Sequence, residues 1–502
     1  MTIVAEQVVV VGAGIAGCTA ALEAAQKGLR VTLIDEHPQN TAAMSLDAPY
    51  FYGARLAPVL SDEGTIADRV LGSNNLLMEC LEAGVEVLTN TCAWGIFVPG
   101  PNNEHMESKQ IGLADQEKSW MASFDYLIIA AGARDLVLSF PGWHLPGVLG
   151  AKAATTLLGK YQALGGNRML VLGSGNTALQ LALQALDSGI SVTGIVEPAT
   201  EALGDSDLVA QLKARGVQFH LGKTIQQALG VNEVSGARLV EMTGDKATNV
   251  TLDIECDTIC MAYGVIPNIE LAAVAGCAMN YDDAQAGWAP TVGTDMQTSV
   301  KGIYVVGDAA GVNEAALIAP EVAIHQGAVA ANAIALLEGL EASELPTPEA
   351  VSTSQATYPP SRWLTSLVAA GGMDVMACQC EEMSRKDLVE VRAPKYVGCG
   401  RSSPEGAVST FVAQGQASQD MLKRMTRVGM GHCQGRRCRE HSAMLLADAA
   451  GVSLSNVQPG SYRVPVRPLP LNIIRDHEEP ASLREHWPTW LHPVDGSVNS
   501  AH

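Results

Sequence analysis

The stretch VVVVGAGIAG, residues 8–17, decides the fold of this chain. Its apolar run is typical of a buried strand, and it leads through three glycines into an Ala-rich, helix-forming segment over residues 18–27. Gly12 permits a tight turn, Gly14 lets a pyrophosphate approach the backbone, and Gly17 lets the helix pack close to the strand. The stretch therefore predicts the first strand, turn and helix of a dinucleotide-binding fold.

An acidic residue follows at the spacing that such folds use for the ribose. Residues 31–34 predict the next strand, and Asp35 follows it, 23 positions after Gly12. A carboxylate here accepts hydrogen bonds from ribose hydroxyls, while the N-terminus of the helix presents free N–H groups to the phosphates. Glu36 is a second acid at the same strand end, so we expect both carboxylates in the cofactor site.

A second copy of this pattern begins at residue 169. Residues 169–172 predict a strand, and the turn GSGNTA, residues 173–178, carries Gly173 and Gly175 before a helix over residues 178–186. The position 23 residues after Gly173 is Val196, and the acid Glu197 comes one position later. A nucleotide site and a fold kept as scaffold therefore both stay open. Acidic residues from 197 to 207 would repel a 2′-phosphate, which favours NAD over NADP.

A third motif lies at residues 302–308, GIYVVGD, which predict a buried strand ending at Gly307 and Asp308 before an Ala-rich helix over residues 316–337. It resembles the second FAD motif of flavoproteins with two dinucleotide folds, which implies that Asp308 meets the ribityl–phosphate region of FAD. Residues 126–133, with Ala131 and Gly132, resemble the crossover out of the FAD domain, and residues 262–268 resemble the return. The resemblance implies an α/β fold in which a second Rossmann-like domain is inserted in the first.

The N-terminal half lacks the cysteine pair that disulfide reductases of this fold carry beside the flavin. Its cysteines are Cys18, Cys80, Cys92, Cys256, Cys260 and Cys277. We expect Cys256 and Cys260, spaced C-x3-C, to be buried inert thiols. Thiol–disulfide exchange is therefore not the expected function.

Four further cysteines follow a Pro- and Ser/Thr-rich linker, as a C-x-C pair and a C-x4-C pair: Cys378, Cys380, Cys433 and Cys438. Four thiolates suffice for one [2Fe–2S] cluster. Structural zinc sites space their ligands C-x2–4-C, so the C-x-C pair favours iron–sulfur, while zinc and unmetallated thiols stay open. Basic residues nearby suit an anionic cluster: Lys423, Arg424, Arg427, Arg436 and Arg437. We expect Cys399 to be uninvolved.

The segments GMGHCQGR at 429–436 and YRVPVRPLPL at 462–471 resemble the bacterioferritin-associated-ferredoxin (BFD) type of [2Fe–2S] domain. With FPGWHLPGV at 140–148, the whole chain is similar to the α subunit of the opine oxidase, proline or D-hydroxyproline dehydrogenase and hydrogen cyanide synthase family. Two segments depart from that pattern: residues 391–406 look inserted, and residues 40–56 lack the Gly-Gly-Gln-type turn of many relatives.

The resemblance implies an oxidoreductase subunit that acts on CH–NH groups. Its FAD and [2Fe–2S] cluster would relay electrons from a substrate-oxidising flavoprotein β subunit to a quinone or another carrier, and a small third subunit would be a further partner. Three alternatives stay open: a stand-alone NADH-dependent flavin/iron–sulfur reductase, a scaffold without cofactors, and a subunit of an HCN-forming glycine dehydrogenase. Whether the second fold binds NAD, and which substrate is oxidised, also stays open.

The expected divisions follow the motifs: a first FAD part (1–145), an inserted NAD(P)-like domain (146–275), a second FAD part (276–345), a linker (346–372), a BFD-like domain (373–470) and a tail (471–502). In the tail, Trp487 and Trp490 favour a contact surface. We assign no catalytic residue. Arg55 and Arg134 are expected in loops, solvated or near a phosphate, and His325 in the last long helix, either packed or catalytic.

Composition excludes some function classes. With 502 residues, 47% hydrophobic and 17% charged, the chain is globular and long enough for several domains. Its net charge of −21 argues against a nucleic-acid partner. The first apolar run leads into a glycine turn rather than a signal-peptide cleavage site, and no run reaches the ~20 apolar residues of a membrane span. We therefore expect a cytoplasmic protein, peripheral to the inner membrane at most through its acceptor.

Overall fold

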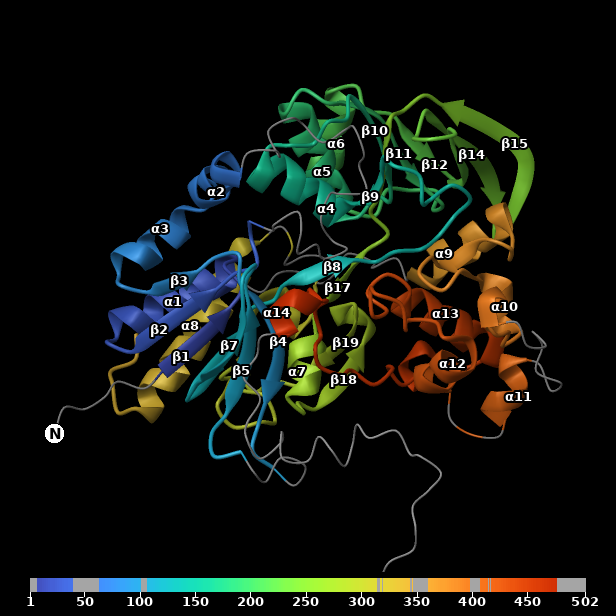
Figure 1. The fold of residues 1–502 in the computed structure, drawn as a ribbon. Helices are drawn as coiled ribbons and strands as arrows, with labels where there is room; N and C mark the ends of the chain where they lie inside the picture. The colour runs from blue at the N-terminus through green and yellow to red at the C-terminus, as the bar shows by residue number, and fades with distance from the viewer. Residues whose placement is uncertain are drawn as a thin grey trace, which may run out of the picture.

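The computed structural model describes residues 7–38, 63–100, 106–313, 317, 319–343, 345, 360–397, 407–413, 415 and 417–475, with backbone alone for 63–67, 411 and 475. Figure 1 shows three bodies: the N-terminal α/β body at the left, an inserted α/β body at the top and a helical C-terminal body at the right. Among the described residues, no helix is both long and apolar enough to cross a bilayer.

The first body is built on a parallel sheet of order β20-β7-β1-β2-β3. Its strands are β1 (Gln7–Val11), β2 (Arg30–Ile34), β3 (Glu86–Leu88), β7 (Tyr126–Ile129) and β20 (Ile303–Val305). β20 pairs with β7 although the inserted body separates the two in sequence, as the order of the motifs predicts. A three-stranded antiparallel sheet is added by β4 (Cys92–Phe97), β5 (Gln110–Ala114) and β6 (Ser119–Ser123).

Two long helices of the first body pack against each other at close range. They are α1 (Ile15–Gln26) and α8 (Pro320–Leu337), and a Cβ on Gly327 would lie 2.4 Å from the carbonyl oxygen of Ala16. The second helix begins at Pro320, later than the sequence predicts, because proline fits the first helical position where no N–H is needed. Two shorter helices, α2 (Glu63–Gly72) and α3 (Asn75–Glu82), precede β3.

The inserted body holds a second parallel sheet, of order β12-β11-β10-β16-β9. Its strands are β9 (Val148–Gly150), β10 (Arg168–Leu172), β11 (Ser191–Glu197), β12 (Phe219–Leu221) and β16 (Thr258–Met261). The flanking helices are α4 (Ala151–Thr156), which continues as a π-turn over Leu157–Tyr161, α5 (Asn176–Asp187) and α6 (Ser206–Ala214). Antiparallel strands follow β12: β13 (Lys223–Leu229), β14 (Gly236–Thr243) and β15 (Lys246–Ile254).

An antiparallel strand pair carries the chain between these two bodies. β8 (Ala133–Asp135) is the outgoing strand and β17 (Val265–Pro267) the returning one. The chain then forms α7 (Glu270–Val274) and the pair β18 (Met279–Asp282) and β19 (Gly287–Pro290) before it reaches β20.

The C-terminal body is mainly helical. It comprises α9 (Pro360–Gly371), β21 (Met376–Cys378), β22 (Met383–Ser384), α10 (Arg385–Val389), α11 (Val408–Ala413), α12 (Gln419–Thr426) and α13 (Arg439–Ala450). The chain then leaves this body, and α14 (Leu471–Arg475) lies near β4 and β17 (Figure 1). The apolar side chains of the C-terminal body, among them Trp363 and Leu445, belong to one continuous core with Leu172 and Ile259 of the inserted body. The C-terminal body is therefore packed as an extension of the inserted body.

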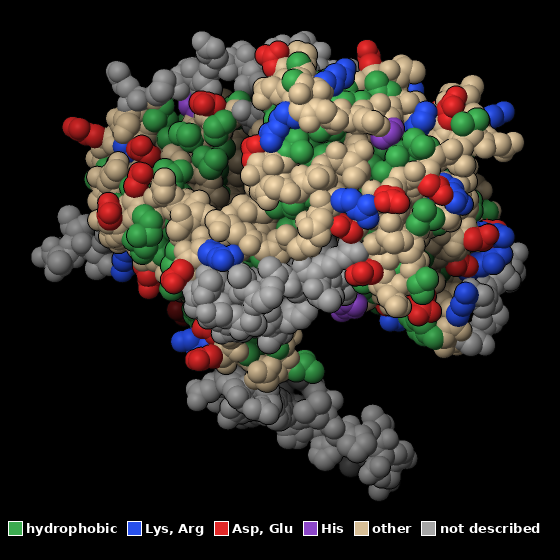
Figure 2. Space-filling view, turned by 90° about the horizontal axis from the view of Figure 1, so that it is seen from above, with side chains coloured by type: hydrophobic (Ala, Val, Ile, Leu, Met, Phe, Trp, Pro, Cys, Tyr) green, Lys and Arg blue, Asp and Glu red, His purple; other side chains and the backbone are tan. Residues whose placement is uncertain are grey.

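Charged side chains of both signs are interspersed on the face that Figure 2 shows, with Asp and Glu (red) among Lys and Arg (blue). This mixed pattern on an acidic chain accords with the prediction that no nucleic acid binds, since a phosphate backbone needs a basic face.

Because α1 lies so close to the first glycine turn, we expect a side chain added at this contact to destabilise the protein. A Cβ on Gly17 would lie 1.9 Å from the carbonyl oxygen of Gly12, and backbone cannot move aside as a side chain can. Gly17→Ala should therefore lower the free energy of unfolding by about 2–3 kcal/mol, measured by urea denaturation. Gly72→Ala is the control, since its added Cβ would have no neighbour within 4 Å. Equal stability of the two variants would contradict the packing role.

Candidate functional site

A large cavity, the first cavity below, lies at the carboxyl ends of the first sheet, where α/β folds bind their ligands. Its volume is about 530 Å³. Among its lining residues are seven of the predicted cofactor contacts: Gly12, Gly14, Asp35, Glu36, Ala131, Gly132 and Asp308. Gly17 and Gly307 do not line it; they pack behind it, where a Cβ on Gly307 would lie 3.0 Å from that of Ala16.

Asp35 is held on the glycine turn at one end of the cavity. Its carboxylate accepts hydrogen bonds from the backbone N–H of Ala13, at 2.6 Å, and of His37, at 2.8 Å. The ring of His37 in turn lies 2.7 Å from the hydroxyl of Tyr161, which comes from the inserted body. Burial lowers the pKa of His37, so its imidazole is neutral at pH 7.

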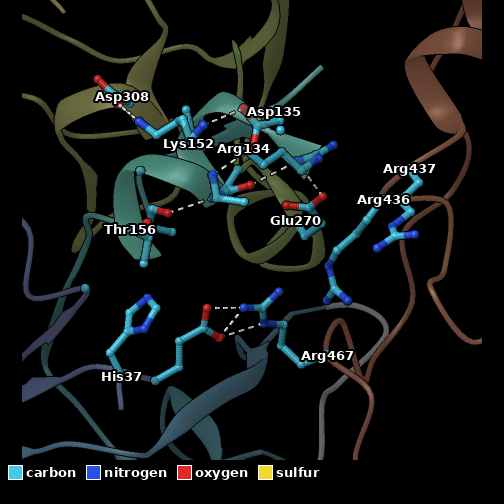
Figure 3. A pocket seen from close by; sticks show the side chains of 18 of the residues that line it. His37, Arg134, Asp135, Lys152, Thr156, Glu270, Asp308, Arg436, Arg437 and Arg467 are labelled. Atoms are coloured by element: carbon cyan, nitrogen blue, oxygen red, sulfur yellow. Dashed lines mark hydrogen bonds and ion pairs between the residues drawn. The ribbon is translucent and has the colours of Figure 1, made fainter. Parts of the chain in front are cut away.

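Asp308 lies at the opposite end of the cavity and pairs with a lysine of the inserted body (Figure 3). The ammonium of Lys152 is 3.0 Å from the Asp308 carboxylate. Asp135 on β8 accepts hydrogen bonds from the backbone N–H groups of Lys152 and Ala153, at 2.8 and 3.1 Å, and so fixes the start of α4. The start of α4 and the side chain of Lys152 therefore face the place where the sequence predicts the ribityl–phosphate region of FAD.

These residues fit a dinucleotide. A Cβ on Gly14 would meet nothing within 4 Å, so the turn leaves open the space that a pyrophosphate needs. Acidic groups stand at the ribose end, and a cation stands beside Asp308 at the other. Ala131 and Gly132, the end of the crossover strand, line the wall between them.

Arg134 differs from expectation. The prediction of a solvated loop residue is wrong, because Arg134 lies on β8 and is 8% exposed. The alternative of a phosphate contact stays a prediction, since Arg134 lines the first cavity. Its guanidinium is 3.0 Å from the carboxylate of Glu270 on α7 and 2.9 Å from that of Glu440 on α13. Burial opposes the ionisation of Glu270, but the charges of Arg134, Arg439 and Arg436 outweigh it and lower the pKa of Glu270. The two carboxylates were missed because they lie far from Arg134 in sequence.

The other two candidates from the sequence lie elsewhere. His325 is on α8, as predicted, and is half-buried, but it lines neither the large cavity nor the two described below. Arg55, the segment 40–56 and the tryptophans of the tail lie outside the described residues.

The second glycine turn also forms a hydrogen bond with an acidic residue. An irregularity in the strand pairing explains why this residue comes one position later in the sequence than in the first fold. The register of β10 against β11 shifts between Met169 and Leu170, so β11 holds one extra residue. Glu197 therefore stands where Asp35 stands in the first fold and accepts a hydrogen bond from the backbone N–H of Ser174 at 3.1 Å. The side chain of Glu197 is fully buried, and burial raises its pKa.

This second site is closed over by protein. The pocket beside Gly173, Gly175 and Glu197 has a volume of only about 90 Å³. Residues 203–205 cross the turn, and the backbone N–H of Gly204 donates to the carbonyl of Ser174 at 2.8 Å. Trp363 of α9 lines the same pocket with its ring 4.6 Å from that of Tyr263.

The four C-terminal cysteines line a third cavity together. Its volume is about 280 Å³, and its lining includes Cys378, Cys380, Cys433 and Cys438. Their thiols are within hydrogen-bonding reach of one another, and the ring of His432 is 3.9 Å from the sulfur of Cys380. Among the described residues no three His, Cys, Asp or Glu side chains converge tightly enough for a single metal ion. Cys399 lies outside the described residues.

The hydrogen bonds in this cavity favour the thiolate form of two of the four cysteines, Cys433 and Cys378. Hydrogen bonds from Cys380 and Cys438 lower the pKa of Cys433 to about 2, aided by backbone N–H groups of Gly435 and Arg437. A hydrogen bond from Cys438 lowers the pKa of Cys378 to about 7. The same contacts raise the pKa of Cys380 and Cys438, so full deprotonation of all four needs a cationic centre between them. That donor set fits an iron–sulfur cluster, which four thiolates hold.

Comparison with known proteins defines the class. The family model of the pyridine nucleotide-disulphide oxidoreductases matches residues 6–333, so the chain belongs to this family of flavin- and nucleotide-binding enzymes. The sarcosine oxidase A3 domain matches residues 395–477. The predicted α/β architecture with two Rossmann-like domains is confirmed.

Within that class the chain is similar to the A subunit of opine oxidase and to HcnB, as its motifs predict. It is 26% identical to the A subunit of opine oxidase from Agrobacterium tumefaciens (strain Ach5), over 92% of this chain and 90% of that protein. It is 25% identical to hydrogen cyanide synthase subunit HcnB of Pseudomonas protegens, over 95% and 99%. The L-proline dehydrogenase structure from P. horikoshii shares the fold, with a TM-score of 0.60, 19% identity and coverage of 94% and 79%.

The open space beside Gly14 predicts that a larger residue at this position prevents cofactor binding. Gly14→Val adds a side chain whose Cβ would meet none of the described atoms within 4 Å, and it would fill the space open to the pyrophosphate. We expect a folded protein without flavin colour, measured by visible absorbance and by thermal unfolding of the cofactor-free protein. Full flavin occupancy in this variant would contradict the assignment of the first cavity.

Glu270 predicts a pH-dependent contribution to stability. Glu270→Gln leaves the buried charge of Arg134 less compensated and should lower the free energy of unfolding by about 3 kcal/mol at pH 7. Because the folded pKa is depressed, this contribution is complete above the ordinary value of 4.5 and is lost as pH falls through the lowered pKa. The deficit should therefore shrink below pH 4.5. Glu255→Gln, which breaks an exposed pair with Arg168, should change stability little.

Proposed function

We propose that this chain is the electron-transfer subunit of a heteromeric amino-acid dehydrogenase or oxidase. The first cavity binds FAD, the four thiols hold one [2Fe–2S] cluster in a BFD-like domain, and a flavoprotein β subunit oxidises an opine, a proline-type amino acid or glycine. The relatives support the heteromeric assembly, because the opine oxidase and hydrogen cyanide synthase proteins are themselves named as subunits.

One observation carries the proposal: the cavity for the dinucleotide and the cavity of the four thiols have a common wall. Trp143, Gln379 and Arg437 line both. Gln379 lies between two of the cysteines, and the indole N–H of Trp143 donates to the carbonyl of Met376 on β21 at 3.0 Å. Redox groups in the two cavities would be one layer of side chains apart, and electron tunnelling weakens steeply with distance.

The chain's own residues divide the work of such a relay. FAD, when bound, would supply a group that can accept two electrons together and release them one at a time, which matches the single electron that a [2Fe–2S] cluster can take. Asp35 and Glu36 hold the ribose end, the open turn at Gly14 admits the pyrophosphate, and Asp308 with Lys152 receives the ribityl region. The backbone N–H groups of Gly435 and Arg437 stabilise the thiolate of Cys433.

Substrate oxidation in the partner is supported by the state of two of the cations that line the first cavity, Arg134 and Lys152. A site that binds an amino acid pairs the substrate's carboxylate with a cation. Here Arg134 is paired with Glu270 and Glu440, and Lys152 is paired with Asp308. These pairs favour a cofactor site over a substrate site.

The alternative of a stand-alone NADH-dependent reductase is disfavoured by the second glycine turn. Its pocket has a volume of about 90 Å³, much smaller than the 530 Å³ or so of the first cavity. The carboxylate of Glu197 already accepts a hydrogen bond from the hydroxyl of Ser174. We therefore propose that the second fold is a scaffold. The HCN-forming glycine dehydrogenase stays a second candidate within the same class, favoured by the 25% identity to HcnB over nearly the whole chain.

The cluster assignment is tested by serine substitution. Replacing Cys378, Cys380, Cys433 or Cys438 by Ser should abolish the iron–sulfur signal in electron paramagnetic resonance while some flavin is retained. The untreated protein should contain about two iron and two sulfide per chain. Cys277→Ser is the control, because this buried thiol hydrogen-bonds to Thr298 in the core of the first body and does not line the four-thiol cavity. Stoichiometric zinc without sulfide would contradict the assignment.

The relay itself is tested with and without the partner. The isolated chain should carry FAD and cluster, should not oxidise opines, proline or glycine, and should keep its flavin oxidised when NADH is added without oxygen. Co-purified with the flavoprotein encoded beside it, it should reduce a dye when the substrate is added. Turnover by the single chain, or rapid bleaching by NADH, would overturn the proposal.

A further inference from the structure

The C-terminal body reaches back to the first cavity through residues 461–470, the C-terminal strap. Val466 of the strap donates its backbone N–H to the carbonyl of Trp94 on β4 at 2.8 Å. A Cβ on Gly95 would lie 2.8 Å from a methyl group of Val464, so the strap packs directly on this strand. Val466 is 7% exposed, and it lines the first cavity.

A series of contacts connects the four-thiol cavity with the first cavity, and it begins in the loop between two of the cysteines. Arg436 is in the loop between Cys433 and Cys438 and is 5% exposed. Its guanidinium donates to the carbonyl of Val466 on the strap. The loop positions Arg436, because the backbone N–H of Arg436 bonds to the carbonyl of Cys433 at 3.2 Å. Any group that closes this loop around the thiols therefore also fixes the strap.

This series of contacts finishes in the first cavity, where the ribose is expected. Arg467, next to Val466, forms a two-pronged ion pair with the carboxylate of Glu36, with Nε 2.9 Å from one oxygen. In Figure 3, Arg467 is drawn with His37 to its left and with Arg436 and Arg437 to its right. Asp35, the neighbour of Glu36, holds the glycine turn. The pair is only partly exposed, at 18% for Arg467 and 31% for Glu36, so solvent weakens it less than a surface pair.

We propose that Arg467 is a positioning residue that couples the two cofactor sites. The loop of the four-thiol cavity holds Arg436, Arg436 holds the strap, and the strap places Arg467 on Glu36. Each cofactor therefore binds more tightly when the other is present, and the coupling is reciprocal because both ligands favour one closed arrangement. This inference rests on the proposed function, which supplies FAD and the cluster as the two ligands.

The test measures FAD affinity in the full-length chain with and without the cluster. Deflavinated protein is titrated with FAD, by calorimetry, before and after the cluster is removed anaerobically with an iron chelator. In the unmodified chain, removal of the cluster should raise the Kd for FAD about tenfold, which is within the usual range of coupling between sites. In Arg467→Ala, the Kd should start higher and should not respond to the cluster.

Three further variants separate coupling from a merely structural role. Arg463→Ala changes an exposed arginine of the same strap and should keep the full cluster dependence. Glu36→Gln removes the other half of the pair and should behave as Arg467→Ala does. Arg467→Lys keeps the charge and should restore part of the coupling. In the reverse direction, FAD should slow the release of iron to the chelator in the unmodified chain and not in Arg467→Ala.

The outcomes are distinguishable. A chain that binds FAD but no iron and sulfide overturns the proposed function together with this inference. A chain that binds both, with an FAD affinity that ignores the cluster, overturns the inference alone. Persistence of the tenfold effect in Arg467→Ala would also overturn it, because the strap would then not carry the coupling.

Discussion

The arrangement of the three bodies depends on one buried guanidinium. Arg134 lies on the outgoing crossover strand, and its side chain donates to the carbonyl of Pro267 and the side chain of Asn268 on the returning segment, at 3.2 and 3.1 Å. The same group is ion-paired with Glu270 and Glu440. A buried charge is tolerated only where it is paired and hydrogen-bonded. The crossover, the first body and the C-terminal body must therefore meet at this point together.

Around that junction, similar backbone in two places meets different surroundings. Two glycine turns of the same design present an acid to the first N–H of the turn, through Asp35 in one and Glu197 in the other. In the first fold, the space beyond the turn stays open; in the second, residues 203–205 and Trp363 fill it. Side chains and loops, rather than the fold, decide which turn serves a cofactor.

Much of the first site was predictable because its determinants are local. The glycine turn with Asp35, and the Gly307–Asp308 strand end, are short patterns with a fixed geometric purpose. The four cysteines were found by spacing, and the structure brings them to one cavity. Arg134 was misjudged because its partner Glu440 lies 306 positions away, and the offset of Glu197 depends on a single extra residue in β11. Long-range pairing and strand irregularities leave no local pattern, and the strap from the C-terminal body to Glu36 is another such case.

The closing of the second glycine turn also gives that fold a mechanical role. Trp363 lines the pocket beside the second glycine turn, and its neighbours on α9 join the apolar core of the inserted body. The C-terminal body is thereby attached to the inserted body through the same pocket that this turn lines. A contact within one chain does not dissociate as a bound ligand does, so the attachment keeps these two bodies at a constant separation.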